Sequence, residues 1–302
     1  KEGTEFIIYK QLPHVSILSI ESKRSFGDSV LEYLQEEIAK RAGLFKTVEA
    51  ANIGEYKERS EKSMPRILVV IDEFQVLLSG GDKLSYAAAG KLEDLSKRAR
   101  SFGINLVMSS QSLSDVDISS STLSNLGLRI ALKMNESDAA RFMSHENTVA
   151  VRFNRPGQAL YNGANGLLTG NIEFQVANLT NTQIKEKVIE LQEIALVKFP
   201  KAINEKFVFD GSKAPSIYDT QKSSLHLSTL KDKKDVSLFN LIAGFPVHLS
   251  PEPSLVPMGD QRGTNVLIVG KDVLGAIDLI NNFTCQLLSL IHISEPTRLR
   301  RS

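Results

Sequence analysis

Apolar positions in the first 180 or so residues follow two patterns that alternate along the chain. The continuous apolar run at 67–71 is typical of a strand covered on both faces of a parallel sheet, and the apolar-rich stretches at 104–108 and 128–132 predict two further buried strands. Apolar residues at helical spacing predict helices over 27–42 and 86–101. Strands that alternate with helices form right-handed βαβ units, so the pattern predicts an α/β fold with a mostly parallel sheet.

Weaker local signals predict the remaining elements of this region. Ser25 is the expected N-cap of the 27–42 helix, and Gly43 is its expected end. Two short strands around Asn-Gly pairs predict a hairpin between 159 and 177. Further elements are expected as strands at 6–9 and 15–20 and as helices at 137–144 and 181–199.

The alternation of strands and helices stops near position 182, and this change divides the chain. Residues 1–182 predict one α/β domain, and 183–240 predict a helix followed by a polar, lysine-rich linker. A second set of elements at 241–290 predicts the start of another α/β module, with a strand at 265–269. The ending at 291–302 resembles translated adapter sequence, so we expect a non-native tail there.

Composition narrows the class of protein. The 302 residues are 42% hydrophobic and 24% charged, as in globular proteins, and 36 Lys and Arg balance 35 Asp and Glu. The balanced charge does not by itself indicate nucleic-acid binding, although it is compatible with a local basic groove. No apolar run has the length of a membrane span, and no signal peptide is visible. The single cysteine, Cys285, cannot form an internal disulfide and is expected in a core, which fits a reducing, cytoplasmic setting.

Polar side chains follow two of the predicted strands. Asp72 and Glu73 come directly after the 67–71 run, and Ser109, Ser110 and Gln111 follow the 104–108 run. Ligands bind at the carboxyl ends of strands in open parallel sheets, where two carboxylates suit a Mg²⁺-nucleotide. The alternative is that both strands simply run into solvated polar loops.

The order of these motifs resembles the FtsK/SpoIIIE family of P-loop motor ATPases. The resemblance rests on V-V-I-D-E-F, then R-x-R-x-x-G-I-x-L-x-x-x-S-Q, then L-R-I-A-L-K and S-D-A, and it covers about residues 1–180. It implies a RecA-like P-loop NTPase domain that uses ATP and Mg²⁺. Asp72 would be the Mg²⁺-shell residue, Glu73 the catalytic base and Gln111 the polar sensor. Ser109 and Ser110 depart from the family's usual A-T before that Gln.

The same resemblance implies a ring. Motors of this family place nucleotide between subunits of a homo-oligomer, expected here as a hexamer, with an arginine supplied in trans. The stretch E-E-I-A-K-R is similar to the family's E-M-x-R-R helix, which makes Arg41 the predicted arginine finger, with Arg98 and Arg100 as alternatives. A purely local interpretation of Arg41 is a cation near a helix C-terminus. The implied partner is double-stranded DNA, or a polypeptide as in type VII secretion, with possible attachment to the inner face of the membrane.

One family motif is absent. No G-x-x-x-x-G-K-S/T phosphate-binding loop occurs in the sequence, and family order places that loop upstream of Lys1. We therefore expect this chain alone to bind ATP poorly, and we expect the region around Gly270 and Lys271 to be a degenerate nucleotide site. The leading hypothesis is a fragment of a DNA-translocating motor. A type VII secretion motor and a non-catalytic assembly module stay open as alternatives.

Overall fold

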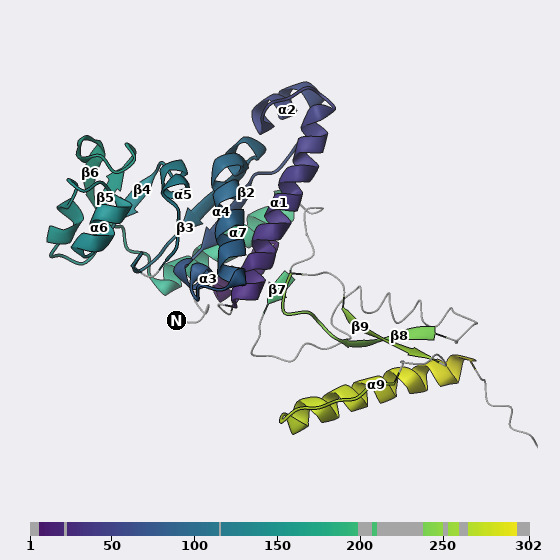
Figure 1. Ribbon diagram of the computed structural model, residues 1–302. Helices are drawn as coiled ribbons and strands as arrows, with labels where there is room; N and C mark the ends of the chain where they lie inside the picture. Colours follow the sequence, from purple (N-terminus) through teal and green to yellow (C-terminus); the bar gives the residue numbers. More distant parts are fainter. Residues whose placement is uncertain are drawn as a thin grey trace, which may run out of the picture. The chain divides into compact units, whose positions relative to one another are not determined.

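The computed structural model describes residues 6–20, 23–114, 116–198, 207–209, 238–249, 253–259 and 265–294. The chain divides into two compact units, Lys1–Asp210 and Gly211–Ser302, and each is described by itself (Figure 1). Among these described residues, no helix combines the length and the apolar character needed to cross a membrane.

The first unit alternates helices and strands, which confirms the predicted α/β class. Parallel pairing joins β2 to β3 and β1 to β7, whereas β4, β5 and β6 form an antiparallel sheet. In chain order its described elements are η1 (Ile7–Gln11), β1 (Ile17–Ser19), α1 (Arg24–Lys46), α2 (Ile53–Ser60), β2 (Ile67–Ile71), α3 (Gln75–Leu78), α4 (Lys83–Arg98), η2 (Ala99–Phe102), β3 (Ile104–Met108), α5 (Ser120–Asn125), β4 (Arg129–Ala131), α6 (Glu136–Phe142), η3 (Val149–Arg152), β5 (Gln158–Asn162), η4 (Leu168–Gly170), β6 (Asn171–Gln175), α7 (Asn181–Lys198) and β7 (Phe207–Phe209).

Some predicted boundaries at the N-terminal end are wrong. Residues 6–9, predicted as a strand, lie in a turn and the 3₁₀ helix η1. Ser25 lies inside α1 and makes no cap, and α1 continues through Gly43 to Lys46. The helix continues because its buried stripe extends to Phe45, and tertiary packing outweighs the roughly 1 kcal/mol that a mid-helix glycine costs.

The core of the first unit lies between helices and one face of the β2–β3 pair. Side chains of α1, α3 and α4 pack there against Val69 of β2 and Leu106 of β3, and Figure 1 shows α1 and α4 side by side over these strands. The opposite face is open, because Leu68, Val70 and Val107 are 66%, 51% and 52% exposed. The prediction that these strands are covered on both faces is therefore wrong for this chain. Within the described residues, β3 pairs with β2 alone.

An ion pair fixes the start of α4 against α1. The Arg24 guanidinium contacts both carboxylate oxygens of Asp82, the N-cap of α4, with Nη1 3.0 Å from Oδ2. The hydrogen bonds from Arg24, and then that from the Ser85 amide, lower the pKa of Asp82 well below its usual range. Ser85 completes a capping box with Asp82, so the first turn of α4 is satisfied locally.

The predicted hairpin is confirmed as β5 and β6, in antiparallel register with Asn162 opposite Asn171. Asn162 is fully buried, and its Oδ1 accepts from the amides of Ala164 and Gly166 at 2.9 and 2.8 Å. Gly166 has φ +89°, and a Cβ there would lie 2.7 Å from the carbonyl carbon of Met143. The N-G-A-N-G sequence thus builds a turn that only glycine permits at position 166.

The second unit consists of β8 (Leu238–Gly244), β9 (Ser254–Gly259) and α9 (Val273–Ser294) in its described part. The strands are antiparallel, and Gln286 of α9 pairs with both the amide and the carbonyl of Ile242 at 2.9 Å. The predicted strand at 265–269 is wrong, since those residues form neither strand nor helix and Leu267 is 86% exposed. Cys285 is exposed rather than in a core, because helical periodicity turns Phe283 and Gln286 inward. The last residues, 295–302, lie outside the described part.

Candidate functional site

The backbone brings the ends of β2 and β3 together. The two strands run parallel with Ile71 opposite Met108. Beyond that pair, the Ser109 amide donates to the Ile71 carbonyl, and the Phe74 amide donates to the Ser109 carbonyl, both at 3.0 Å. The residues that follow each strand therefore share one edge of the sheet, as predicted for parallel strands.

Each of the two carboxylates accepts a hydrogen bond from the end of β3. The Ser109 hydroxyl donates to Asp72 Oδ1, and the Gln111 side-chain amide donates to Glu73 Oε1. The Glu73 backbone amide also donates to Asp72 Oδ1 at 3.1 Å. Asp72 and Gln111 are exposed and Glu73 is partly exposed, so both carboxylates can reach solvent and a solute.

Glu73 has an unusual backbone conformation. Its φ is +50°, in the left-handed region that residues other than glycine rarely adopt. Such a conformation costs of order 1–3 kcal/mol and persists where surrounding packing determines it. Here the next residues form α3, whose Leu77 and Leu78 are buried in the core. The turn therefore holds the Glu73 carboxylate at the sheet edge at the expense of local strain.

The side chains present fit Mg²⁺ with a nucleotide better than Mg²⁺ alone. No group of three or more His, Cys, Asp or Glu side chains gathers among the described residues in a way that could hold a metal. Mg²⁺ in nucleotide sites is commonly bound by one or two carboxylates together with substrate phosphates. Asp72 supplies one such carboxylate, and the Ser109 hydroxyl beside it is a second oxygen.

The structure places Arg41 away from this edge. Arg41 is 3% exposed, its Nε donates to Glu37 at 2.7 Å, and its Nη1 donates to the Phe102 carbonyl at 2.7 Å. Phe102, which Arg41 contacts, precedes β3, whereas Gln111 follows it. Because a five-residue strand rises roughly 16 Å, Arg41 lies at the opposite end of β3 from Gln111. Arg98, paired with Asp94, and Arg100 are both exposed. Within one chain, Asp72, Glu73 and Gln111 meet and Arg41 does not join them.

Replacing Arg41 by Ala is expected to lower the free energy of unfolding by about 2–4 kcal/mol, because Glu37 and the Phe102 carbonyl lose their buried partner. The measurement is urea unfolding of the 302-residue chain, followed by circular dichroism. The matched control is Lys40→Ala on the same helix turn, where the side chain is 74% exposed and the expected change is within about 0.5 kcal/mol. Equal stability of the two variants would contradict a packing role for Arg41 and favour its role in trans.

Sequence reasoning missed the part that Ser109 plays. The departure of Ser109 from the family's usual residue was visible, but its hydroxyl bond to Asp72 needed the register of β2 against β3. It also missed Asp138 and Arg141 of α6, which contact the loop after Gln111. The only signal for these two was the S-D-A motif, which contains Asp138.

Comparisons with known proteins bear on the fold and on the resemblance to motor ATPases. No model of a known protein family matches the sequence. The DNA translocase FtsK of Streptococcus agalactiae serotype V is 26% identical over 157 residues, which are 47% of this chain and 18% of that protein. FtsK of Streptococcus pyogenes serotype M3 is 25% identical over the same length, covering 47% of this chain and 19% of its own. This chain thus spans less than a fifth of the length of these curated relatives.

Solved structures match over a larger share of the chain. EssC (ATPases 2 and 3) from Geobacillus thermodenitrificans aligns over 94% of this chain and 51% of its own, with a TM-score of 0.55 and 18% identity. The pCW3 conjugation coupling protein TcpA, solved with ATPγS, aligns over 63% of this chain and 54% of its own, with a TM-score of 0.51 and 22% identity. The chain is a relative of FtsK/SpoIIIE-type motor ATPases. The predicted FtsK-type P-loop ATPase fold is confirmed.

Proposed function

We propose that this FtsK/SpoIIIE-type chain is part of an ATP-driven ring motor that translocates double-stranded DNA. The observation that carries the proposal is the adjacent pair Asp72 and Glu73 at the end of β2, each bonded to a side chain from the end of β3. Membership of a motor ATPase family supports ATP as the substrate. Asp72 would hold Mg²⁺, which neutralises phosphate charge when it is bound with the nucleotide.

The hydrolytic roles that we propose are those that the family resemblance implies, and the contacts of the pair support them. Glu73 is placed to accept the proton of the attacking water at its Oε atoms, so that the oxygen of that water bonds to the γ-phosphorus as the β–γ bridge breaks. Gln111 donates to Glu73 Oε1, which fixes the carboxylate and places an amide beside the water. The Ser109 hydroxyl donates to Asp72 Oδ1 and so orients the carboxylate that would face the phosphates.

The ring and its location extend the proposal. We expect a cytoplasmic homo-oligomer, a hexamer, in which an arginine from the neighbouring subunit reaches the γ-phosphate. Arg41 is the arginine that the family pattern designates, and it would have to release Glu37 and Phe102 to do so. Arg98 and Arg100 are exposed, and Arg98 would have to release only its surface ion pair with Asp94. Because they are exposed whereas Arg41 is buried, we favour residues 98–100 as the source of the arginine finger.

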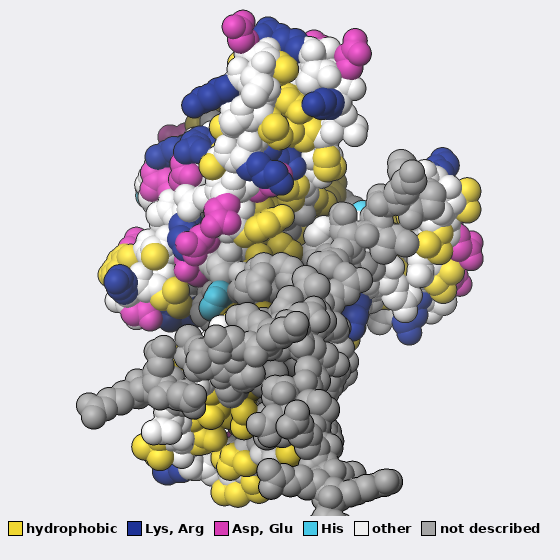
Figure 2. Space-filling view, turned by 90° about the vertical axis from the view of Figure 1, so that its right-hand side faces the viewer, with side chains coloured by type: hydrophobic (Ala, Val, Ile, Leu, Met, Phe, Trp, Pro, Cys, Tyr) yellow, Lys and Arg dark blue, Asp and Glu magenta, His cyan; other side chains and the backbone are white. Residues whose placement is uncertain are grey.

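The cargo is the finer part of the proposal. DNA is favoured because the curated relatives are DNA translocases. The net charge of +1 does not indicate a continuous basic surface for DNA, and the face in Figure 2 mixes acidic and basic side chains. The second candidate is protein export, because the cytoplasmic domain of the Thermomonospora curvata type VII secretion ATPase EccC aligns over 63% of this chain and 23% of its own, with a TM-score of 0.50 and 21% identity.

Salt dependence separates the two cargoes. The full-length protein is titrated with a fluorescent duplex at about 50 mM and about 200 mM salt, and a DNA motor should lose about 10³–10⁵ in affinity because it releases counterions from 6–10 phosphate contacts. Duplexes of scrambled sequence should bind equally well. An absence of duplex binding at the lower salt would contradict the DNA proposal and leave the export motor.

A further inference from the structure

The segment that follows Gln111 is held by helix α6. Asp138 of α6 is 5% exposed, and its Oδ1 accepts from the Leu113 amide at 2.9 Å. Its Oδ2 accepts from the Asn135 side chain at 2.9 Å, while Asn135 caps α6 through the Asp138 amide at 2.7 Å. A buried carboxylate is thus used to fix the backbone two residues beyond Gln111.

Arg141, one helical turn later, holds the same segment by its carbonyls. Its Nη1 donates to Leu113, and its Nη2 donates to Val116 at 2.6 Å and to Ile118 at 3.3 Å. Leu113, Val116 and Ile118 are themselves buried in the core beneath α4. Asp138 and Arg141 therefore satisfy both the amide and the carbonyl of Leu113, and the described part of the segment has little freedom relative to α6.

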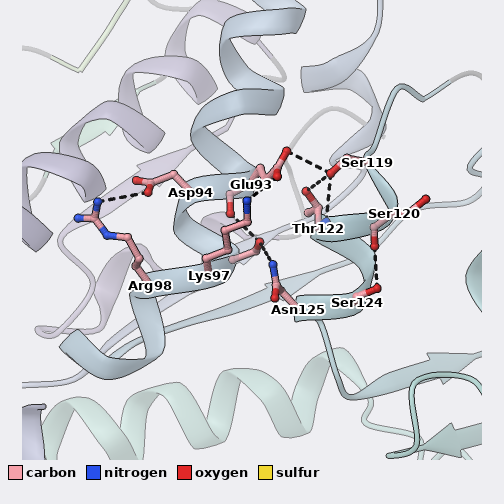
Figure 3. A network of polar contacts seen from close by, with 10 residues as sticks. Glu93, Asp94, Lys97, Arg98, Ser119, Ser120, Thr122, Ser124 and Asn125 are labelled. Atoms are coloured by element: carbon pink, nitrogen blue, oxygen red, sulfur yellow. Dashed lines mark hydrogen bonds and ion pairs between the residues drawn. The ribbon is translucent and has the colours of Figure 1, made fainter.

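The far end of the segment is fixed as well. Ser119 caps α5 through the Thr122 amide at 3.1 Å, and its hydroxyl donates to Glu93 of α4 at 3.2 Å. Asn125, at the end of α5, donates to Ser96 at 3.3 Å, so α5 is tied to α4 at both of its ends (Figure 3). The described part of the segment is therefore held by α6 on one side and by α4 on the other.

Helix α6 belongs to the lobe of β4 and β5. Met143, just after α6, packs with Ala131 of β4 and Leu160 of β5 in a separate small core. Arg129 of β4 donates to the Phe142 carbonyl at the end of α6. The lobe and α6 therefore form one packed body, with Asp138 and Arg141 as its contacts to the Gln111 segment.

We propose that Asp138 and Arg141 are positioning residues that set Gln111 against Glu73 and so couple the β4–β5 lobe to ATP hydrolysis. The inference rests on the proposed function. Two extended residues span at most about 7 Å, so Gln111 must follow Leu113 closely when α6 moves. A displacement of about 1 Å at a catalytic group can cost 10²-fold in rate.

The test is a double-mutant cycle in the full-length protein. Arg141→Met is expected to lower kcat about 10–100-fold with KM for ATP unchanged, since it misplaces Gln111 and leaves the phosphate contacts intact. Gln111→Ala should lower kcat on its own account. In the Gln111→Ala background, Arg141→Met should change kcat by less than about twofold, because the group it positions is already gone. Glu136→Gln on the exposed side of α6 is the control and should match wild type.

A second readout needs no turnover. Backbone hydrogen exchange of the 302-residue chain should quicken in Arg141→Met at 109–118 and also at Glu73 and Phe74, whose amides bond Asp72 and Ser109. Exchange in α1 should stay unchanged. Where Arg141→Met fails to fold, Arg141→Lys replaces it, because lysine keeps the charge but lacks the two separate Nη atoms with which the guanidinium contacts the three carbonyls.

The outcomes separate the two proposals. Additive losses in the cycle, with quicker exchange confined to 112–118, would overturn the positioning role while Glu73→Gln still abolishes hydrolysis. Unchanged hydrolysis in Glu73→Gln would instead overturn the proposed function itself.

Discussion

Replacing Glu73 by Gln in the full-length protein is expected to lower ATP hydrolysis by about 10²–10⁴-fold, the usual contribution of a general base. The new side chain has the same shape and can still accept the hydrogen bond from Gln111, but its amide cannot take a proton from water. ATP binding should persist because Asp72 and the phosphate contacts are unchanged. The measurement compares steady-state phosphate release with equilibrium binding of a fluorescent ATP analogue.

Glu61→Gln is the matched control for this substitution. Glu61 is also an exposed glutamate with a left-handed backbone, at φ +55°. It is the C-cap of α2, however, and does not lie at the edge of the sheet that follows β2. Hydrolysis in this variant should equal wild type. Wild-type turnover in Glu73→Gln would contradict the catalytic role of Glu73. An absence of ATP hydrolysis in the unmodified full-length protein would instead favour a non-catalytic assembly module.

The 302-residue chain is expected to bind Mg-ATP with a dissociation constant in the millimolar range or weaker. Strong phosphate binding needs backbone N–H groups arranged around the phosphates and a lysine, and the sequence contains no G-x-x-x-x-G-K-S/T to supply them. Isothermal titration calorimetry measures this directly. Extending the chain at its N-terminus with a segment that carries the motif should raise affinity at least about 10²-fold, or about 2.7 kcal/mol.

The Gly270–Lys271 region provides the control for that titration. Lys271→Ala should leave the weak binding unchanged, because residues 265–270 form neither strand nor helix and so provide no phosphate-binding turn between a strand and a helix. Micromolar binding by the unextended chain would contradict the expectation. If that micromolar binding were lost in Lys271→Ala, the second unit would contain a working nucleotide site.

The sequence predicted the sheet edge well because its signals are local. The runs at 67–71 and 104–108 match β2 and β3 to the residue. Parallel pairing then places Asp72, Glu73 and Gln111 at one edge without further information. The resemblance to motor ATPases could likewise be stated from motif order, since those motifs lie at strand ends.

The features that sequence reasoning missed depend on long-range packing. Glu37 lies one turn before Arg41 and is visible as a helix partner, but the Phe102 carbonyl is 61 positions away. The continuation of α1 through Gly43 is decided by the pocket that receives Phe45. Asp138 and Arg141 act on backbone groups of the 113–118 segment, and no pattern of residue types reports which backbone atoms a side chain will reach.

The open face of β2 and β3 determines how this chain behaves in solution. Leu68, Val70 and Val107 form an apolar strip beside β3, whose second edge is unpaired among the described residues. Apolar strips next to free strand edges are the surfaces through which folded proteins adhere to one another. We therefore expect this strip to contribute to self-association of the isolated chain at high concentration, and polar substitution of Val70 to reduce that association without loss of the core on the other face of β2.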